Sequence, residues 1–343
     1  MARMLKGGHS DSVLCVECKE HLLVSGGEGG ELCTWDLRTE ELTHKLTKSD
    51  GCTSICLPKN KPDTLYASFR ENVEQYDVRN FDSPVDSLPV CDDEINQIVL
   101  NDKEEFLAAC DDTGNVKVFT VRAGENKVFK TLRNKHTNIC SSVTFRPGKP
   151  WDIVTGGFDF NLIHWDFGKL KVLNMWNMQE LISDESLDSV NYLLNPPFVH
   201  HVNVNPDGTL VACGLGNGGV LLMDSSRRHL KKEHYFQAHS QGVSQVHFVD
   251  STKFITGSND EQILMWDLSR GEGAGEAAAA PTPITNGHRT NPAPVVPALT
   301  ENVICHKIDH KFKINWLTPV TRNGVLAVAV ADQRSDISLY AIP

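Results

Sequence analysis

The sequence predicts an all-β protein in which seven small antiparallel sheets form the blades of one closed ring. Three observations lead to this prediction. Short apolar segments of strand length alternate with polar turns along most of the chain. A unit of such segments recurs at intervals of roughly 43 residues and ends in an aromatic or large apolar residue, usually followed by Asp. The first residues form a short strand that has no partner in the first unit, so the seven-bladed ring is expected to close through its chain ends.

The clearest unit covers residues 239–267. Strands are expected at 243–247, 254–256 and 263–266, and a tight turn at 258–261 joins the last two. The carboxylate of an Asp can accept a hydrogen bond from an imidazole, the imidazole can contact a Thr hydroxyl, and that hydroxyl can accept an indole N–H. Buried polar atoms need such partners. We therefore predict a structural tetrad of His239, Thr256, Asp260 and Trp266.

The unit recurs along the chain. A second complete tetrad is predicted from His136, Thr155, Asp159 and Trp165. The seven units end, in chain order, at Trp35, Tyr76, Phe119, Trp165, Met223, Trp266 and Tyr340. The intervals before Met223 and before Tyr340 are longer than the others, so both need insertions.

The remaining units are less complete. The first has His9, Ser25 and Trp35, but Gly29 stands where the acid belongs, with Glu28 beside it. The second has strands expected at 54–57, 64–68 and 73–76 but lacks both the His and the acid. We expect this second unit to be held together mainly by packing. In the others, strands are expected at 95–100, 106–110 and 116–119, at 139–145, 152–155 and 162–165, and at 314–317, 325–330 and 337–340.

These tetrads and Trp-Asp endings resemble those of the WD-repeat family. The resemblance implies a seven-bladed WD-repeat β-propeller with four strands in each blade. Too few residues follow Tyr340 for a fourth strand in the last blade. Residues 2–6 are therefore expected to supply that strand, which joins the two ends of the ring and removes an open sheet edge.

We expect a single domain over residues 1–343, with two insertions. Residues 177–195 are acidic and read as a solvated inter-blade loop or short helix. Residues 271–300 are rich in Ala, Pro and Gly, a composition typical of disorder. A strand at 303–308 is expected to complete blade six after this insertion, so the insertion is a loop excursion and not a domain boundary.

Composition excludes several classes of function. The net charge of −11 disfavours a nucleic-acid surface, because phosphate binding requires clustered Lys and Arg. No apolar run approaches the roughly 18 residues of a membrane helix, so no membrane partner is expected. The start has no apolar core of signal-peptide length, and the 10 cysteines are scattered over strand positions. An intracellular protein, cytoplasmic or nuclear, is the interpretation that fits.

No metal, cofactor or catalytic centre is predicted. Cys15 and Cys18 have the spacing of a metal knuckle, but no second knuckle or His pair follows. His200 and His201 are adjacent on a strand and are expected to face opposite ways. The tetrads combine hydroxyl, His and Asp as hydrolases do. Here the indole would occupy the hydroxyl, and no nucleophile elbow is present.

One surface feature indicates a binding role. Asp36 and Arg38 follow the third strand of blade one, and Asp77 and Arg79 follow that of blade two with the same spacing. Both pairs should emerge on one rim of the ring, on neighbouring blades. Two forked guanidiniums side by side can bind carboxylates or carbonyls of a partner. The alternative is that each Arg pairs with a local acid and only caps its strand.

The two pairs resemble the Trp-Asp-x-Arg box of many WD-repeat proteins, although Tyr76 replaces Trp in the second. The box implies docking to the adaptor of cullin-4-type ubiquitin ligases, damage-specific DNA-binding protein one. The protein is then expected to be a non-catalytic substrate receptor that binds this adaptor and an unknown client. The alternative is a general assembly scaffold or peptide reader with no ubiquitin ligase link.

Overall fold

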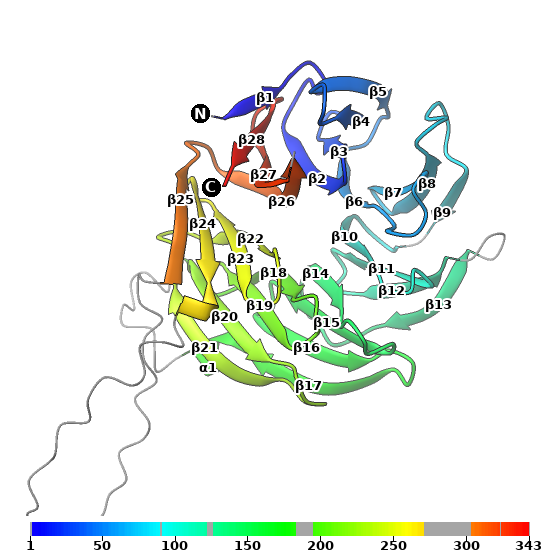
Figure 1. Ribbon diagram of the computed structural model, residues 1–343. Helices are drawn as coiled ribbons and strands as arrows, with labels where there is room; N and C mark the ends of the chain where they lie inside the picture. Colours follow the sequence, from blue (N-terminus) through cyan, green and yellow to red (C-terminus); the bar gives the residue numbers. More distant parts are fainter. Residues whose placement is uncertain are drawn as a thin grey trace, which may run out of the picture.

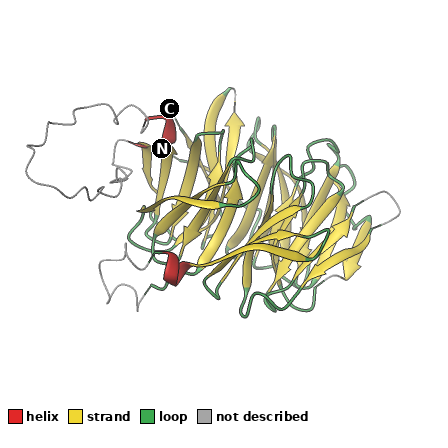
Figure 2. Cartoon of the chain, turned by 90° about the horizontal axis from the view of Figure 1, so that it is seen from below, coloured by secondary structure: helices red, strands yellow, loops and turns green. Residues whose placement is uncertain are grey.

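The computed structural model describes residues 2–89, 91–121, 126–182, 195–270, 303–322 and 324–342. Its strands form seven four-stranded antiparallel sheets arranged radially around a central axis (Figure 1). The chain is therefore an all-β, seven-bladed propeller, as predicted. Seen from the side, the blades stack next to one another along a thick ring (Figure 2).

Each blade takes its strands from consecutive segments of the chain, except the last. Blades one to three contain β2 (Val13–Lys19), β3 (Leu22–Gly27), β4 (Glu31–Asp36) and β5 (Glu41–Thr47); β6 (Cys52–Cys56), β7 (Thr64–Phe69), β8 (Asn72–Asp77) and β9 (Asp86–Pro89); and β10 (Ile95–Leu100), β11 (Phe106–Asp111), β12 (Val116–Thr120) and β13 (Lys127–Leu132). Blades four to six contain β14 (Cys140–Phe145), β15 (Asp152–Gly157), β16 (Asn161–Asp166) and β17 (Lys171–Asn177); β18 (Val199–Val204), β19 (Leu210–Leu215), β20 (Gly219–Asp224) and β21 (Lys231–Gln237); and β22 (Val243–Phe248), β23 (Lys253–Ser258), β24 (Gln262–Asp267) and β25 (Ile304–Asp309). Blade seven contains β26 (Ile314–Arg322), β27 (Val325–Asp332), β28 (Ile337–Ala341) and β1 (Arg3–Leu5).

The ring closes through the first strand. β1 pairs antiparallel with β28, in the register Arg3 with Leu339, Met4 with Ser338 and Leu5 with Ile337. In Figure 1 the blue start and the red end of the chain share one blade. The predicted closure by the amino-terminal strand is confirmed, and β25 completes blade six as expected.

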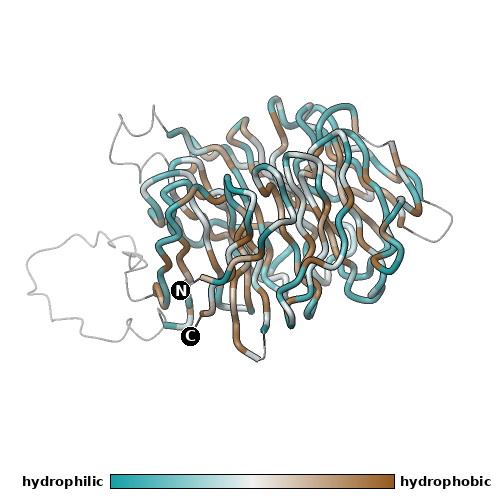
Figure 3. The backbone as a smooth tube through the Cα atoms, turned by 90° about the horizontal axis from the view of Figure 1, so that it is seen from above, coloured by the Kyte–Doolittle hydropathy of each residue, from teal (hydrophilic) through white to brown (hydrophobic). Residues whose placement is uncertain are grey.

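The second and third strands of each blade form the core. In β3, β4, β15, β16, β19 and β23 nearly every residue is buried, because each sheet is covered on both faces by its neighbours. The outer strand β5 is mostly exposed. Accordingly, brown stretches run through the strands in Figure 3, and many turns are teal. A Cβ at Gly26 would lie 2.5 Å from the sulfur of Cys52 on the next blade, so this position admits only glycine.

The two insertions are only partly described. Met178–Leu181 forms the single-turn helix α1, capped by the Asn177 side chain. Met178 and Ile182 are fully buried, so these residues belong to the core and not to a solvated loop. Leu268–Arg270 forms the 3-10 helix η1. The rest of the expected acidic loop, and the Ala/Pro/Gly-rich insertion at 271–300, lie outside the described residues. Across the described ranges, no helix has the length and apolarity needed to span a membrane.

Candidate protein-docking face

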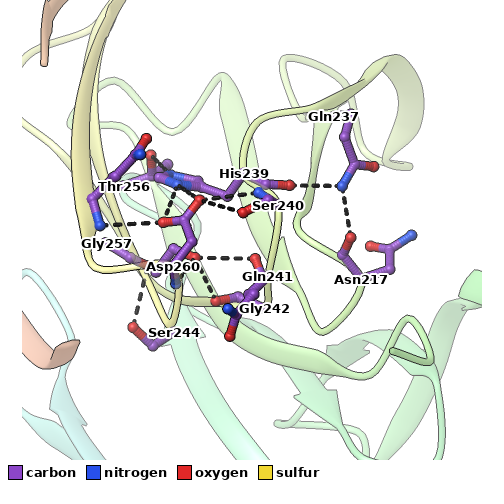
Figure 4. Close-up of polar contacts among 12 residues, drawn as sticks. Asn217, Gln237, His239, Ser240, Gln241, Gly242, Ser244, Thr256, Gly257 and Asp260 are labelled. Atoms are coloured by element: carbon purple, nitrogen blue, oxygen red, sulfur yellow. Dashed lines mark hydrogen bonds and ion pairs between the residues drawn. The ribbon is translucent and has the colours of Figure 1, made fainter. Parts of the chain in front are cut away.

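The tetrad of blade six forms a continuous hydrogen-bonded chain, of which Figure 4 labels His239, Thr256 and Asp260. Nδ1 of His239 lies 3.0 Å from Oδ1 of Asp260, and Nε2 lies 2.8 Å from the hydroxyl of Thr256. The indole of Trp266 donates to that hydroxyl at 2.9 Å. Burial acts to raise the pKa of Asp260, but the hydrogen bond and charge of His239 outweigh it and hold that pKa at about 2. The chain links the loop before the blade to its second and third strands.

Blade four repeats this arrangement. His136 contacts Asp159 at 2.9 Å and Thr155 at 2.8 Å, and Trp165 donates to Thr155 at 3.0 Å. The Thr155 hydroxyl is fully buried, as is that of Thr256. Because the indole and the imidazole already occupy each hydroxyl, these groups hold the blade together and are not presented to a substrate.

Blade one has an acid that the sequence did not point to. His9 contacts Ser25 at 2.7 Å, and Trp35 donates to Ser25 at 2.8 Å. Glu31, on the third strand, takes the place of the turn acid: its carboxylate accepts from the backbone N–H and the hydroxyl of Ser10, at 2.9 and 2.5 Å. Burial lowers the pKa of His9 to about 4, against the opposing charge of Glu31.

Blade two replaces the tetrad with an ion pair. Nζ of Lys48 contacts both oxygens of the Glu74 carboxylate, which also accepts from the hydroxyl of Tyr76. The Glu74 side chain is only 9% exposed. Mainly packing was expected in this blade from the sequence, and the structure adds an ion pair that was not predicted. A Lys and a Glu link this blade where other blades have a tetrad. Neither residue type occurs in the predicted tetrads, so the sequence pattern did not indicate this pair.

Blade seven has another set of linking residues in place of a complete tetrad. His310 bridges Asp332 at 2.8 Å and the hydroxyl of Tyr340 at 2.9 Å. Arg334 binds the same carboxylate through Nε and Nη2, at 3.0 and 2.6 Å. The pKa of Asp332 falls to about 2, because these donors outweigh the effect of burial.

The two adjacent histidines lie in different surroundings. His201 is buried beside Gln97, 3.2 Å away across the ring, while His200 lies against Phe158. No group of three or more His, Cys, Asp or Glu side chains within the described ranges is arranged to hold a metal ion.

The predicted Asp-x-Arg pairs lie in the turns that follow β4 and β8. In each turn the Asp carboxylate accepts the backbone N–H of the Arg two residues later, at 2.9 Å for Arg38 and for Arg79, which is an Asx turn. The same carboxylate then receives the guanidinium as a fork. Nε and Nη2 donate at 2.9 and 2.5 Å from Arg38 to Asp36, and at 2.9 and 2.6 Å from Arg79 to Asp77.

Both guanidiniums stay largely in solvent. The side chain of Arg38 is 65% exposed and that of Arg79 is 68% exposed. Hydrogen bonds from each Arg lower the pKa of its aspartate, Asp36 or Asp77, to about 2. Arg79 has a second acidic partner, Asp63, which Nη1 contacts at 3.0 Å. Local pairing, the alternative considered for these residues, is thus present in the unbound protein.

A pocket lies beside the first pair, Asp36 and Arg38. It has a volume of about 370 Å³ and lies between blades one and two. Asp36 and Arg38 line one side, and Asp63 and Val78 line the other, with Trp35 among the remaining lining residues. Arg38, Asp63 and Val78 lie in turns that join the first strand of a blade to the second, or the third to the fourth. They therefore emerge on one face of the ring. We call this side of the ring the Arg38 face. The turns that carry His9, His136 and His239 lie on the opposite face.

Comparisons with known proteins agree with this architecture. The family model "WD domain, G-beta repeat" matches residues 126–166 and 230–267, the segments that contain the two complete tetrads. WD repeat-containing protein 53 homolog of Dictyostelium discoideum is 28% identical over 98% of this chain and 93% of its own length. Restriction of telomere capping protein 1 of Eremothecium gossypii is 22% identical over 70% of this chain, but only 18% of its own length.

A further relative is similar over a shorter stretch. DDB1- and CUL4-associated factor 10 of Danio rerio is 34% identical over 21% of this chain and 14% of its own length. The repeats, the ring and the near full-length match together show a seven-bladed propeller that contains WD40 repeats and is similar to WD repeat-containing protein 53 homolog.

Proposed function

We propose that this WD-repeat scaffold is a substrate receptor of a cullin-4-type ubiquitin ligase, without catalytic activity of its own. Asp36, Arg38, Asp77 and Arg79 bind the ligase adaptor, damage-specific DNA-binding protein one, and another surface binds a client protein. The observation that carries the proposal is the pair of equivalent, exposed guanidiniums on neighbouring blades, with a pocket beside Arg38.

The geometry suits recognition of a protein surface. Each aspartate uses both carboxylate oxygens to fix the fork of its Arg, so little side-chain entropy remains to be lost on binding. Among the described residues, Asp36 is the only acid paired with Arg38, and Nη1 of Arg38 is left for a partner carbonyl or carboxylate. The pocket beside it can accept an apolar side chain of the adaptor.

The similarity to DDB1- and CUL4-associated factor 10 supports the ligase link, since that protein's name places it with this adaptor and cullin. It covers about a fifth of the chain, so the docking pairs remain the principal support.

The test measures binding of the purified adaptor to the full chain by biolayer interferometry. The Arg38→Glu/Arg79→Glu variant should bind at least about tenfold more weakly, because two charge-assisted contacts become repulsive. The matched control is Arg70→Glu/Arg133→Glu, which reverses two exposed arginines on the opposite face and should bind as the wild type does. Thermal melts confirm that each variant is folded.

Unchanged adaptor binding by folded Arg38→Glu/Arg79→Glu would reject the proposal. The local pairing of Arg79 with both Asp77 and Asp63 favours the second candidate, a general assembly scaffold or peptide reader, in that event.

A further inference from the structure

Blades three and four share an exposed pair of aromatic residues that belongs to no tetrad and takes no part in the proposed adaptor docking. Phe129, on the outer strand β13, stacks on Trp151, in the turn between β14 and β15, with 6.2 Å between ring centroids and 28° between the ring planes. Trp151 is 44% exposed and Phe129 is 36% exposed. Val128, next to Phe129 in β13, and Leu170, in the turn whose Gly168 lies against Trp151, are also exposed, at 48% and 51%. Clustered apolar exposure of this kind marks interaction sites more often than isolated residues do.

Buried aromatic rings support the exposed pair and fix its position. Trp151 packs against the rings of Phe106 and Phe167, at 5.8 and 5.4 Å between centroids. Its ring also lies on the backbone of Gly168, where a Cβ would come within 2.9 Å of Cε3. Fixed aromatic rings lose little entropy on binding, which is why they serve as anchors at interfaces.

The turn that presents Trp151 is anchored by a buried cation. The fully buried guanidinium of Arg146 donates to Asp152 at 2.7 Å and to the backbone carbonyl of Arg227 at 3.0 Å, and it also donates to the carbonyl of Ser225. These bonds tie the turn of blade four to blade five. The position of the indole is therefore set by the core.

Several lysines lie on the strands and turns that carry the aromatic pair. Nζ of Lys130 lies over the ring of Phe129, 5.4 Å from its centroid. Four lysines on these strands and turns have no acidic partner among the described residues: Lys127, Lys130, Lys149 and Lys171. The neighbouring carboxylates are already bonded, Asp102 to the Gly148 N–H, Asp152 to Arg146 and Asp166 to Lys169. Unpaired positive charge at one place is unusual in a chain with a net charge of −11.

We propose that this aromatic–lysine patch, formed by Val128, Phe129, Lys130, Lys149, Trp151 and Leu170, binds a short segment of a partner protein in which an apolar anchor is flanked by Asp or Glu. The apolar anchor packs on the Trp151 and Phe129 rings, and the flanking carboxylates pair with Lys130 and Lys149. Acidic character follows from charge complementarity, since a basic segment would be repelled here and attracted to most of the remaining surface. The inference does not depend on adaptor docking, which involves blades one and two.

The test selects peptides from an unbiased phage-displayed library on the immobilised full chain. The enriched peptides should share an apolar residue flanked by acids. Their affinity, measured by fluorescence anisotropy, should fall about tenfold or more in Trp151→Ala and in Lys130→Glu/Lys149→Glu. Arg70→Glu/Arg133→Glu should bind them as the wild type does.

Three results would overturn the proposal: no enrichment, enriched peptides without acidic residues, or equal binding by the folded patch variants. Because Lys130 and Lys149 lie at the surface, their double variant keeps the test decisive if Trp151→Ala is too unstable to purify.

Discussion

The carboxylate of Glu31 lies beside the imidazole of His9, with Oε2 3.9 Å from Nδ1, although both atoms lack a hydrogen-bond partner among the described residues. Blade one thus keeps the His, hydroxyl and indole of a tetrad but has a looser acid contact than blade six, where the imidazole and carboxylate are 3.0 Å apart. This difference has a consequence for stability against acid.

Stability should fall when the pH is lowered from about 6.5 to about 4, because burial lowers the pKa of His9 to about 4 in the folded protein. In this window the unfolded chain binds the proton and the folded protein does not, so unfolding becomes more favourable as the pH drops. The full effect of this one residue is on the order of 3 kcal/mol. Denaturant unfolding at several pH values measures it, and His9→Gln should flatten the profile. A His9→Gln profile as steep as that of the wild type would contradict the assignment.

Trp266→Ala should lower the free energy of unfolding by roughly 3–5 kcal/mol, because it removes a buried ring and leaves the Thr256 hydroxyl without its indole donor. The matched control is Trp151→Ala, since that indole is 44% exposed and belongs to no tetrad. Chemical denaturation compares the two. An unchanged free energy of unfolding in Trp266→Ala would show that the tetrad does not stabilise blade six.

Lys48→Met should destabilise the protein by about 3 kcal/mol, because the buried carboxylate of Glu74 loses its counterion. Adding Glu74→Gln should recover most of this loss, since the amide oxygen still accepts from Tyr76 while the buried charge is gone. Lys6→Met, at a lysine that is 68% exposed, is the control and should be nearly neutral. Failure of Glu74→Gln to rescue Lys48→Met would count against an ion pair as the link in blade two.

Asp36→Asn/Asp77→Asn should weaken adaptor binding by roughly fivefold, about 1 kcal/mol, if the adaptor binds at these turns. An amide has one acceptor oxygen and cannot hold both Nε and Nη2 of its Arg, so each guanidinium becomes less ordered. The loss should be smaller than in Arg38→Glu/Arg79→Glu, because the positive charges remain. Biolayer interferometry measures both, and a larger loss from the Asn variant would contradict an orienting role.

Leu5→Asp should destabilise the ring by at least about 2 kcal/mol, because Leu5 is 1% exposed where β1 pairs with β28 and a charge there has no partner. Lys6→Asp, one residue later and exposed, should have little effect. Comparable thermal melts for the two variants would show that the first strand is dispensable.

The ring, its closure and the positions of the Asp-x-Arg turns were predictable from the sequence, because each depends on residue order and period. His239 and Asp260 stand at the offsets that fit neighbouring strands. Glu31 was missed because it lies beside the His9 imidazole on the third strand and not in the turn. Lys48 and Glu74 were missed because they stabilise blade two with residue types other than the His, Thr, Asp and Trp of a tetrad.

The aromatic–lysine patch could not be predicted from the sequence. Phe129 and Trp151 belong to different blades, and an exposed aromatic residue looks the same in a sequence as a buried one. Only the packing of both rings over Phe106 and Phe167 shows that they are adjacent and supported.

The register of Met4 against Ser338 has a consequence for biosynthesis. During synthesis β1 must wait for β28, because Ser338 lies 334 positions after Met4. At ordinary translation speeds that wait is roughly 20 to 70 s. Throughout it, blade one has no blade seven beside it, so the nascent polypeptide presents apolar sheet surface that chaperones would be expected to shield.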